Sequence, residues 1–169
     1  MQSDVSACCT LMVEEMPNWG YSFTAYEEDR MARTSGRELR ISPKAAREIC
    51  RHIHRMKLSQ AQSFLERVVR KELAVPYRRH NKEVPHKRQL EGWDAGRYPV
   101  KAAGKVLEVL AGLQANAENK GLDTERLRLV HAAAHRGRVL KRYFPRAFGR
   151  SSPNSEMTCH LEFVVEETG

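Results

Sequence analysis

The chain has 169 residues, a net charge of +8 and a hydrophobic fraction of 41%. This length fits one domain of ordinary size with an appended tail, and the composition supports a modest core beneath a largely polar surface. The sequence contains no apolar run of the roughly 18 residues that a membrane helix needs, and its N-terminus lacks the basic cluster of a secretory signal. These features argue against a membrane or secreted protein and predict a cytoplasmic one.

The four cysteines indicate neither a disulfide framework nor a zinc site. Cys8 and Cys9 are adjacent, which is poor disulfide geometry, and Cys50 and Cys159 stand far from any other cysteine in the sequence. No two of them have the short spacing that zinc ligands show. We therefore expect reduced thiols, and neither a metal nor a cofactor.

Charge is distributed unevenly along the chain. Residues 1–36 carry two bases against six acids, and residues 151–169 carry four glutamates and no base. Residues 37–150 carry 27 bases against 11 acids, a net charge of +16. A segment this positive repels itself when it is alone, and a polyanionic partner would relieve that repulsion.

The N-terminal quarter of the chain shows only short patterns. Residues 1–18 have no periodicity and are predicted to be a poorly ordered tail, in which Met16 is a candidate for the translation start. Alternation of apolar and polar residues predicts short strands at 21–25 and 39–41. The charged segment 27–36 ends in a Ser-Gly pair and is predicted to be a turn or linker.

A helix is predicted to begin at Ser42 and Pro43, because serine can cap free N–H groups and proline at the first position loses no bonded donor. Its apolar stripe comprises Ala45, Ile49, Ile53 and Met56. A second stripe on the same helix is cationic and comprises Lys44, Arg47, Arg51 and Arg55. This stripe is either a solvated face or a nucleic-acid contact.

Two further helices carry most of the remaining apolar periodicity. Ser59 and Gln62 have the spacing of a capping box, and the face behind them comprises Ala61, Phe64, Leu65, Val68 and Val69. Pro99 is predicted to open the longest helix and Gly121 to end it. The apolar side of this helix comprises Ala102, Ala103, Val106, Leu107, Leu110, Leu113 and Ala117.

The segment 75–98 between these two helices shows no period and is rich in proline, glycine and basic residues. A loop of this length inside a compact domain is usually functional or disordered. Its candidate RNA contacts are Arg78, Arg79, His80, Lys87, Arg88, Trp93 and Arg97. Trp93 and Tyr98 either pack within the loop or contact RNA.

Two strands, at 127–129 and 157–165, are predicted to pair antiparallel, and the segment between them is strongly basic. Between Glu125 and Glu156 the chain has eight cations, three interleaved aromatic residues and no acid. If the strands continue toward each other, they form a hairpin at about 131–157. Ten further residues per strand would carry it about 30 Å beyond the core.

Such a hairpin needs a partner outside its own domain, because an isolated two-stranded hairpin is marginal in water. Guanidinium groups suit phosphate oxygens, and aromatic rings stack on unpaired bases. The predicted RNA contacts in this segment are Arg136, Arg138, Lys141, Arg142, Tyr143, Arg146, Phe148 and Arg150. The alternative is a solvated, flexible basic loop, against which the loss of every acid and the interleaved aromatics argue.

Other function classes receive less support. His52 and His54 face different ways on a helix, and His131 and His135 would lie about 13 Å apart on a strand, too far to share a metal. A metal-dependent hydrolase is therefore disfavoured. A sequence-specific DNA-binding regulator is the rival class, because the two helices that meet at residues 57–58 resemble a helix-turn-helix. Against it, the densest charge lies in the hairpin.

Three motifs, in order, resemble one known family. KRYFPRAFGR at 141–150 resembles the hairpin signature of the large-subunit ribosomal protein twenty-two family, whose eukaryotic members are numbered seventeen. EGWDAGRYP at 91–99 is similar to the archaeal and eukaryotic branch, and NAENKGLD at 116–123 resembles the segment that closes the long helix of the family. The resemblance covers about residues 19–167.

This resemblance implies an α+β fold in which three helices pack on a small antiparallel three-stranded sheet, with a long protruding β-hairpin. It implies a single rRNA-binding domain at 19–169 that is a structural constituent of the large ribosomal subunit and not an enzyme. Its partners would be large-subunit rRNA, neighbouring ribosomal proteins and the nascent polypeptide, with no membrane and no small-molecule substrate.

The resemblance also implies residue roles in the hairpin. Its tip would line the nascent-peptide exit tunnel, and the tunnel-lining residues would be Val139, Leu140, Lys141 and Arg142. Three arginines, Arg138, Arg146 and Arg150, would clamp phosphates along the hairpin. Pro145 and Gly149 would set the course of its backbone.

Overall fold

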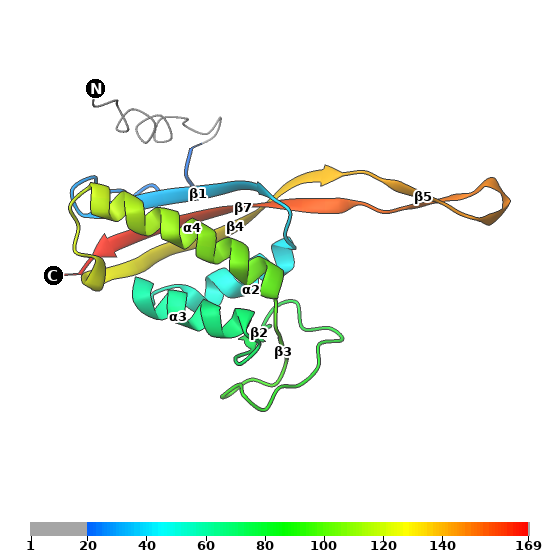
Figure 1. The fold of residues 1–169 in the computed structure, drawn as a ribbon, viewed down its shortest axis with the longest axis horizontal. Coiled ribbons are helices and arrows are strands. Elements are labelled where there is room, and N and C mark those ends of the chain that lie inside the picture. Colours follow the sequence, from blue (N-terminus) through cyan, green and yellow to red (C-terminus); the bar gives the residue numbers. More distant parts are fainter. Residues whose placement is uncertain (1–19, 169) are drawn as a thin grey trace, which may run out of the picture.

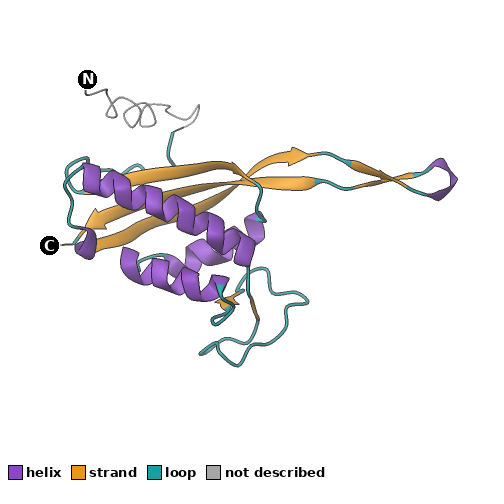
Figure 2. Ribbon diagram, in the orientation of Figure 1, coloured by secondary structure: helices purple, strands orange, loops and turns teal. Residues whose placement is uncertain are grey.

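The computed structural model describes residues 20–168 and has an α+β fold (Figure 1, Figure 2). The main sheet is antiparallel with strand order β1-β7-β4, where β1 is Met31–Leu39, β7 is Glu156–Glu167 and β4 is Leu127–Leu140. The helices are α2 (Pro43–Ile53), α3 (Leu58–Val69) and α4 (Val100–Asn119). The expected three helices on a small antiparallel sheet, with a protruding hairpin, are confirmed. The predicted tail at 1–18 lies outside the described residues.

The central strand β7 owes its position to the alternation of its side chains. Cys159, Leu161, Phe163 and Val165 are buried in the hydrophobic core, and the residues between them face the other side of the sheet. Because strands on both sides pair with β7, Leu129 lies opposite Val165 on one side and Ala32 lies opposite it on the other. The predicted antiparallel pairing of 127–129 with the C-terminal strand is confirmed.

The helices pack in two tiers over one face of this sheet. Helix α4 packs against β1, α2 packs against β4, and α3 packs against α4. The apolar side of α4 is buried as predicted, with Val106, Leu110 and Leu113 fully covered. The helix ends before Gly121, whose φ of +76° is the left-handed conformation that glycine adopts readily.

Helix α2 begins at Pro43 as predicted, but the Ser42 hydroxyl before it makes no capping hydrogen bond. The cationic stripe of this helix is shorter than expected. Arg55 lies beyond the helix in a left-handed conformation with φ +69°, and its N–H donates to the Leu129 carbonyl. The stripe therefore ends at Arg51.

The capping box predicted for α3 is wrong. The helix begins at Leu58 with Lys57 at its N-cap and no side-chain capping bond, so Ser59 already lies inside the first turn. The Gln62 amide donates instead to the Gln114 side chain on α4, at 3.0 Å. The polar pair therefore joins two helices and does not cap one.

The segment 27–36, predicted to be a turn or linker, in fact supplies most of strand β1. Its Ser-Gly pair resembles a turn in sequence, but Gly36 serves close packing: a Cβ there would lie 2.7 Å from the Val109 side chain of α4. The strands predicted at 21–25 and 39–41 are also wrong. No strand covers 21–25, and β1 ends at 39, where the chain turns toward α2.

The loop between α3 and α4 is held by short pairings and side-chain bonds. Strand β2 (Val75–Pro76) pairs with β3 (Gly96–Arg97). The Trp93 indole N–H donates to the Tyr77 carbonyl at 3.0 Å, and the Tyr98 hydroxyl donates to Gln89 at 3.0 Å. In this structure Trp93 and Tyr98 pack within the loop.

Beyond the Arg136–Cys159 pair, β4 and β7 continue as a two-stranded arm, residues 137–157, that stands clear of the body (Figure 1). Its outer part pairs β5 (Tyr143–Pro145) with β6 (Ser151–Pro153), and η2 (Ala147–Gly149) closes the tip. The turn of the arm therefore lies beyond residues 139–142, to which the resemblance gives the tunnel-lining role. Val139 and Leu140 pair with Met157 and Glu156, so they lie partway along the arm.

Two properties of the described residues bear on function. Among residues 20–168, no helix has the length and apolar character needed to cross a membrane. Within the same range, no three His, Cys, Asp or Glu side chains are grouped so that they could hold a metal ion. Cys50 and Cys159 are free thiols in the core, and burial raises the pKa of Cys159 to about 11.

Candidate nucleic-acid interface

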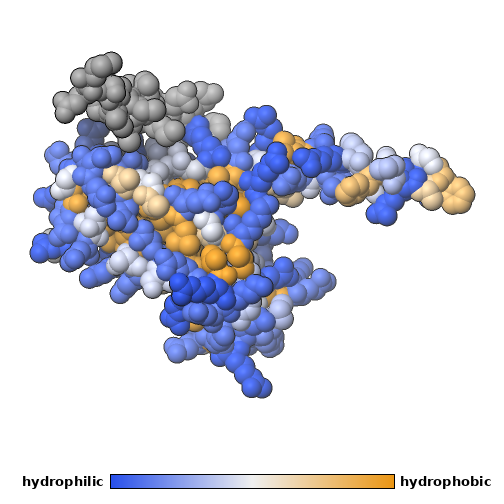
Figure 3. Space-filling model, viewed as in Figure 1, coloured by the Kyte–Doolittle hydropathy of each residue, from blue (hydrophilic) through white to orange (hydrophobic). Residues whose placement is uncertain are grey.

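The arm presents cations and aromatic rings to solvent. Residues 137–157 contain five cations and one acid, Glu156. Every residue from 141 to 150 is exposed. Phe148 is 98% exposed, Tyr143 64% and Phe144 54%, although aromatic side chains usually contribute large buried areas. Figure 3 shows the arm projecting from the body with a largely hydrophilic surface and a more apolar tip.

The tip is a tight turn held by its own backbone. Phe148 and Gly149 are both left-handed, with φ of +57° and +65°. The Arg146 N–H donates to the Arg150 carbonyl at 2.7 Å, and the Arg146 guanidinium donates to the Ser152 hydroxyl at 2.9 Å. A left-handed phenylalanine is strained, so the turn presents Phe148 outward at an energetic cost.

The base of the arm is fixed to β1 by polar contacts. The Arg138 guanidinium donates to Glu38 at 2.7 Å, and the Glu38 N–H donates to Nδ1 of His160 at 3.1 Å. The Thr158 hydroxyl donates to the Arg138 carbonyl at 2.9 Å. A Cβ on Gly137 would lie 2.5 Å from the Thr158 hydroxyl oxygen, so the close approach of these two residues requires glycine at 137. These contacts fix the direction in which the arm leaves the body. They also give Arg138, a predicted phosphate contact, a hydrogen-bond partner within the chain.

On the body, four of the predicted contacts line a single groove, about 810 Å³ in volume. They are Lys44 from α2 and Arg79, His80 and Arg97 from the loop. Two lysines that the sequence reasoning passed over, Lys82 and Lys101, also line it. The sequence does indicate Lys82, because it lies in a strongly basic loop. It does not indicate Lys101, which lies at the start of a helix whose pattern shows only an apolar side.

A buried carboxylate organises the basic loop. Glu48 of α2 is 2% exposed, and its two oxygens accept the backbone N–H groups of Arg78, Arg79 and His80 at 2.9, 3.1 and 3.4 Å. Backbone donors of this kind suit a buried charge, because they replace the water it has lost. With their backbone fixed in this way, the basic side chains of 78–80 project from the body.

The other predicted contacts are dispersed. Arg51 and Arg78 line a small depression beside Glu48, of about 150 Å³. The Lys87 ammonium lies 5.1 Å from the centre of the Tyr98 ring. The remaining body cations in the prediction, Arg47 and Arg88, are exposed. The structure thus gathers some of the predicted residues into a groove and leaves others spread over the surface.

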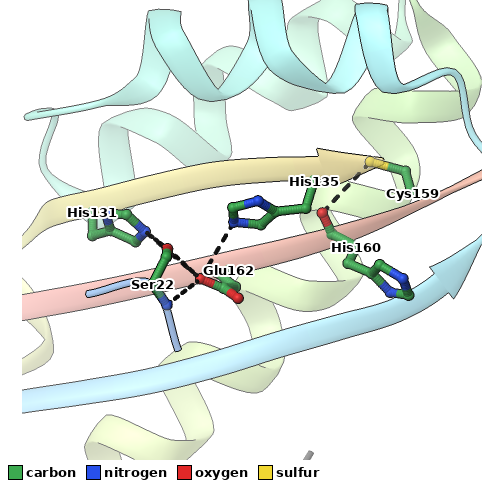
Figure 4. Close-up of polar contacts among 6 residues, drawn as sticks. All are labelled: Ser22, His131, His135, Cys159, His160 and Glu162. Carbon is green, nitrogen blue, oxygen red and sulfur yellow. Dashed lines mark hydrogen bonds and ion pairs between the residues drawn. The ribbon is translucent and has the colours of Figure 1, made fainter. Parts of the chain in front are cut away.

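A second polar cluster covers the sheet face opposite the helices (Figure 4). Glu162 accepts the Ser22 N–H at 3.0 Å and the Ser22 hydroxyl at 2.6 Å. Nε2 of His131 lies 3.1 Å from the same hydroxyl oxygen, and Nε2 of His135 lies 3.5 Å from the carboxylate. The sequence reasoning missed this cluster because its members are 140 residues apart in the chain.

The cluster is not arranged as a catalytic triad. In a triad the histidine stands between the serine hydroxyl and the carboxylate, but here the Ser22 hydroxyl donates directly to Glu162. Burial raises the pKa of the Glu162 carboxyl, but the Ser22 hydrogen bonds and the nearby His135 and His131 outweigh it, so the pKa lies below its ordinary value. The carboxylate is therefore charged at neutral pH, and the serine acts as its donor.

Comparison with known proteins decides the family. The model of the family described as ribosomal protein L22p/L17e matches residues 34–166. The chain belongs to this family. It is 56% identical to the large ribosomal subunit protein uL22 of Methanopyrus kandleri, in an alignment that covers 89% of this chain and 96% of that protein. The uL22 proteins of Archaeoglobus fulgidus and Methanosphaera stadtmanae are 49% and 48% identical, over 89% and 87% of this chain.

Membership in the L22p/L17e family confirms the resemblance drawn from the three motifs. The matched segment 34–166 includes the groove cations of the body and the whole arm. Ser22, whose hydroxyl holds Glu162, lies just before the matched segment.

Proposed function

We propose that this protein binds and organises large-subunit rRNA, with its arm inserted between RNA segments. The L22p/L17e family makes it a structural, non-enzymatic protein of the large ribosomal subunit, and so a cytoplasmic one. One observation carries the finer proposal. Beyond its base, the arm packs on no other part of residues 20–168, and it exposes cations and aromatic rings.

The physical basis is charge neutralisation where RNA strands converge. Arg146 and Arg150 project at the tip, and each can bind a phosphate through two parallel hydrogen bonds. The exposed ring of Phe148 can stack on an unpaired base, a contact worth about 1–3 kcal/mol. Binding releases counterions from the RNA, so the affinity falls steeply with salt concentration. Neighbouring ribosomal proteins would meet the body elsewhere.

We further propose that the tip, Ala147–Gly149, lies in the wall of the nascent-peptide exit tunnel and meets the nascent polypeptide. The tip is the part of the arm farthest from the body (Figure 1). The segment 139–142, to which the resemblance gives the tunnel-lining role, lies nearer the base of the arm than this turn does.

Equilibrium binding to a large-subunit rRNA fragment tests the arm. The R146A/R150A variant should bind more weakly than wild type and should lower the slope of log K against log salt by about 2, one unit for each lost phosphate contact. Its melting temperature should stay within about 1 °C of wild type, because substitutions at exposed sites without packing contacts usually change stability little. A matched R67A/R70A variant, at the C-terminal end of α3, should leave the slope unchanged.

The same binding measurement separates RNA from the rival DNA partner. At equal salt, the protein should prefer the folded rRNA fragment to duplex DNA of the same length, since shape and unpaired bases are what the arm can recognise. Preference for duplex DNA, or an arm variant that binds as tightly as wild type, would contradict the proposal.

A further inference from the structure

Helices α2 and α4 begin at the same end of the body (Figure 1). Residues at both helix starts line the groove described above. The groove is lined by the first turn of each helix and by loop residues 77–82 and 97–99. Its cationic side chains are Lys44, Arg79, Lys82, Arg97 and Lys101, and none of the residues that line it is acidic. A ligand in the groove therefore meets positive charge from three chain segments.

Both helix starts leave backbone donors without partners. Neither start has a side chain that caps it. The first intrahelical hydrogen bonds begin with the amides of Ala46 and Ala103. The amides at 44–45 and 101–102 have no hydrogen-bond partner among residues 20–168. Such N–H groups, at the positive end of a helix dipole, bind anions.

A buried hydroxyl points to the same kind of ligand. Tyr77 is 5% exposed and lines the groove, yet its hydroxyl has no hydrogen-bond partner among the described residues. Every side-chain nitrogen or oxygen atom that is fully buried in residues 20–168 has a hydrogen-bond partner. Because the Tyr77 hydroxyl has no partner there, it is not fully buried and remains accessible from the groove. Burial raises the pKa of Tyr77 to about 12, an effect that Arg97 opposes and Glu48 supports. The hydroxyl therefore keeps its proton and is available as a donor.

We propose that this groove binds consecutive phosphate groups of an RNA backbone, with one phosphate at each helix start and the Tyr77 hydroxyl donating between them. The inference rests on the proposed function and adds a second RNA site, apart from the arm. A backbone segment suits the groove better than a lone anion does, because two separate helix starts and five dispersed cations offer more donors than one phosphate can accept. The groove contacts phosphates and does not read base sequence.

Backbone amide NMR with a uridine tetranucleotide as the probe tests the site directly. The amide resonances at 44–45 and 101–102 should shift together as the oligonucleotide is added at low salt, because their N–H groups gain acceptors. The amides at 58–61, at the start of α3, provide the control and should remain in place. Shifts confined to the arm, or shifts of equal size at the control helix start, would overturn the proposal.

Two variants distinguish failure of this inference from failure of the proposed function. Tyr77→Phe removes only the hydroxyl. K82Q/K101Q removes two cations that line the groove and are not part of the arm. Each should weaken binding of the large-subunit rRNA fragment at least threefold, and K82Q/K101Q should also lower the salt slope by about 2. The charge-matched K71Q/K105Q variant, with Lys71 just after α3 and Lys105 on α4, should bind as wild type does.

If R146A/R150A weakens rRNA binding while both groove variants bind as tightly as wild type, the arm binds RNA and the groove does not, which overturns the inference alone. If neither arm nor groove variants change rRNA affinity, the proposed function itself fails. Thermal melting of each variant, which should lie within about 3 °C of wild type, excludes misfolding as the cause.

Discussion

Glu162 on the central strand accepts two hydrogen bonds from Ser22, which lies 140 residues earlier in the chain. The strand thereby holds the segment before β1 against the sheet face that the helices leave open (Figure 4). The Phe23 ring packs beside His131 in the same layer, with ring centres 5.4 Å apart. This short segment covers polar side chains of β7 that would otherwise face water.

Replacing Ser22 by alanine should loosen this segment. The change removes the 2.6 Å hydrogen bond to the Glu162 carboxylate and leaves the backbone N–H bond in place. The free energy of unfolding should fall by about 1 kcal/mol, measured by chemical denaturation at pH 7. Ser22→Thr, which keeps the hydroxyl, should recover most of the loss; equal stability of wild type and the alanine variant would contradict the assignment.

Stability should decrease on acidification in two stages. Burial lowers the pKa of His131 below 6.5, so this ring resists protonation in the folded state and costs stability as the pH falls below 6.5. The pKa of Glu162 is lowered from 4.5, so its contribution is present above pH 4.5 and is lost as the pH falls through the folded-state value. Thermal melting from pH 7.5 to 3.5 should show both stages.

Glu162→Gln should remove the second stage, since the amide does not titrate. The variant should be less stable than wild type at pH 7, and the difference should shrink below pH 4.5. A constant difference across the whole range would show that Glu162 does not titrate with a lowered pKa. His52 and His54 also have pKa values lowered by burial, so the first stage should persist in this variant.

Gly137 should be intolerant of a side chain. A Cβ there would lie 2.5 Å from the Thr158 hydroxyl oxygen and 2.9 Å from Nε2 of His160, inside the contacts that aim the arm. Gly137→Ala should destabilise the protein by about 1–3 kcal/mol. The control is Gly104→Ala on α4, where nothing lies within 4 Å, and which should stabilise the helix by about 0.5–1 kcal/mol. Equal effects of the two substitutions would rule out this role for Gly137.

Glu48 should control the order of the basic loop. Glu48→Gln keeps the shape of the side chain but removes the charge that three backbone N–H groups share. The free energy of unfolding should fall by about 1–3 kcal/mol, and the amides of Arg78, Arg79 and His80 should exchange with deuterium faster than in wild type. Unchanged exchange at these three amides would show that the carboxylate does not hold the loop.

The sequence predicts those helices and strands whose apolar residues recur at a regular spacing. Alternation identifies β7, and helical spacing identifies the buried sides of α2, α3 and α4, because burial on one face leaves a pattern that local sequence records. Strand β1 has no such pattern. Its Gly36 reflects the close approach of Val109, a residue 73 positions later, and sequence alone cannot separate that cause from a turn.

The residues of the candidate site also divide into those that the sequence indicates and those that it does not. The basic residues of the arm are visible in the sequence because they are contiguous and lack acids. Their register is not visible in the sequence, because beyond its base the arm packs no face against the core of residues 20–168. The strand pairing puts the turn at 147–149, beyond the residues 139–142 to which the resemblance gives the tunnel-lining role. The groove depends on where two helix starts meet, and the role of Tyr77 follows from tertiary packing alone.

Hydrogen exchange of the arm amides, residues 137–157, with and without the large-subunit rRNA fragment tests the central claim most directly. In the free protein these amides should exchange within seconds, because a two-stranded ladder without a packed face is marginally stable. On RNA binding they should become protected by at least a hundredfold, while the core amides of β7 stay unchanged. An arm protected in the free protein, or one that remains unprotected in the complex, would contradict the account.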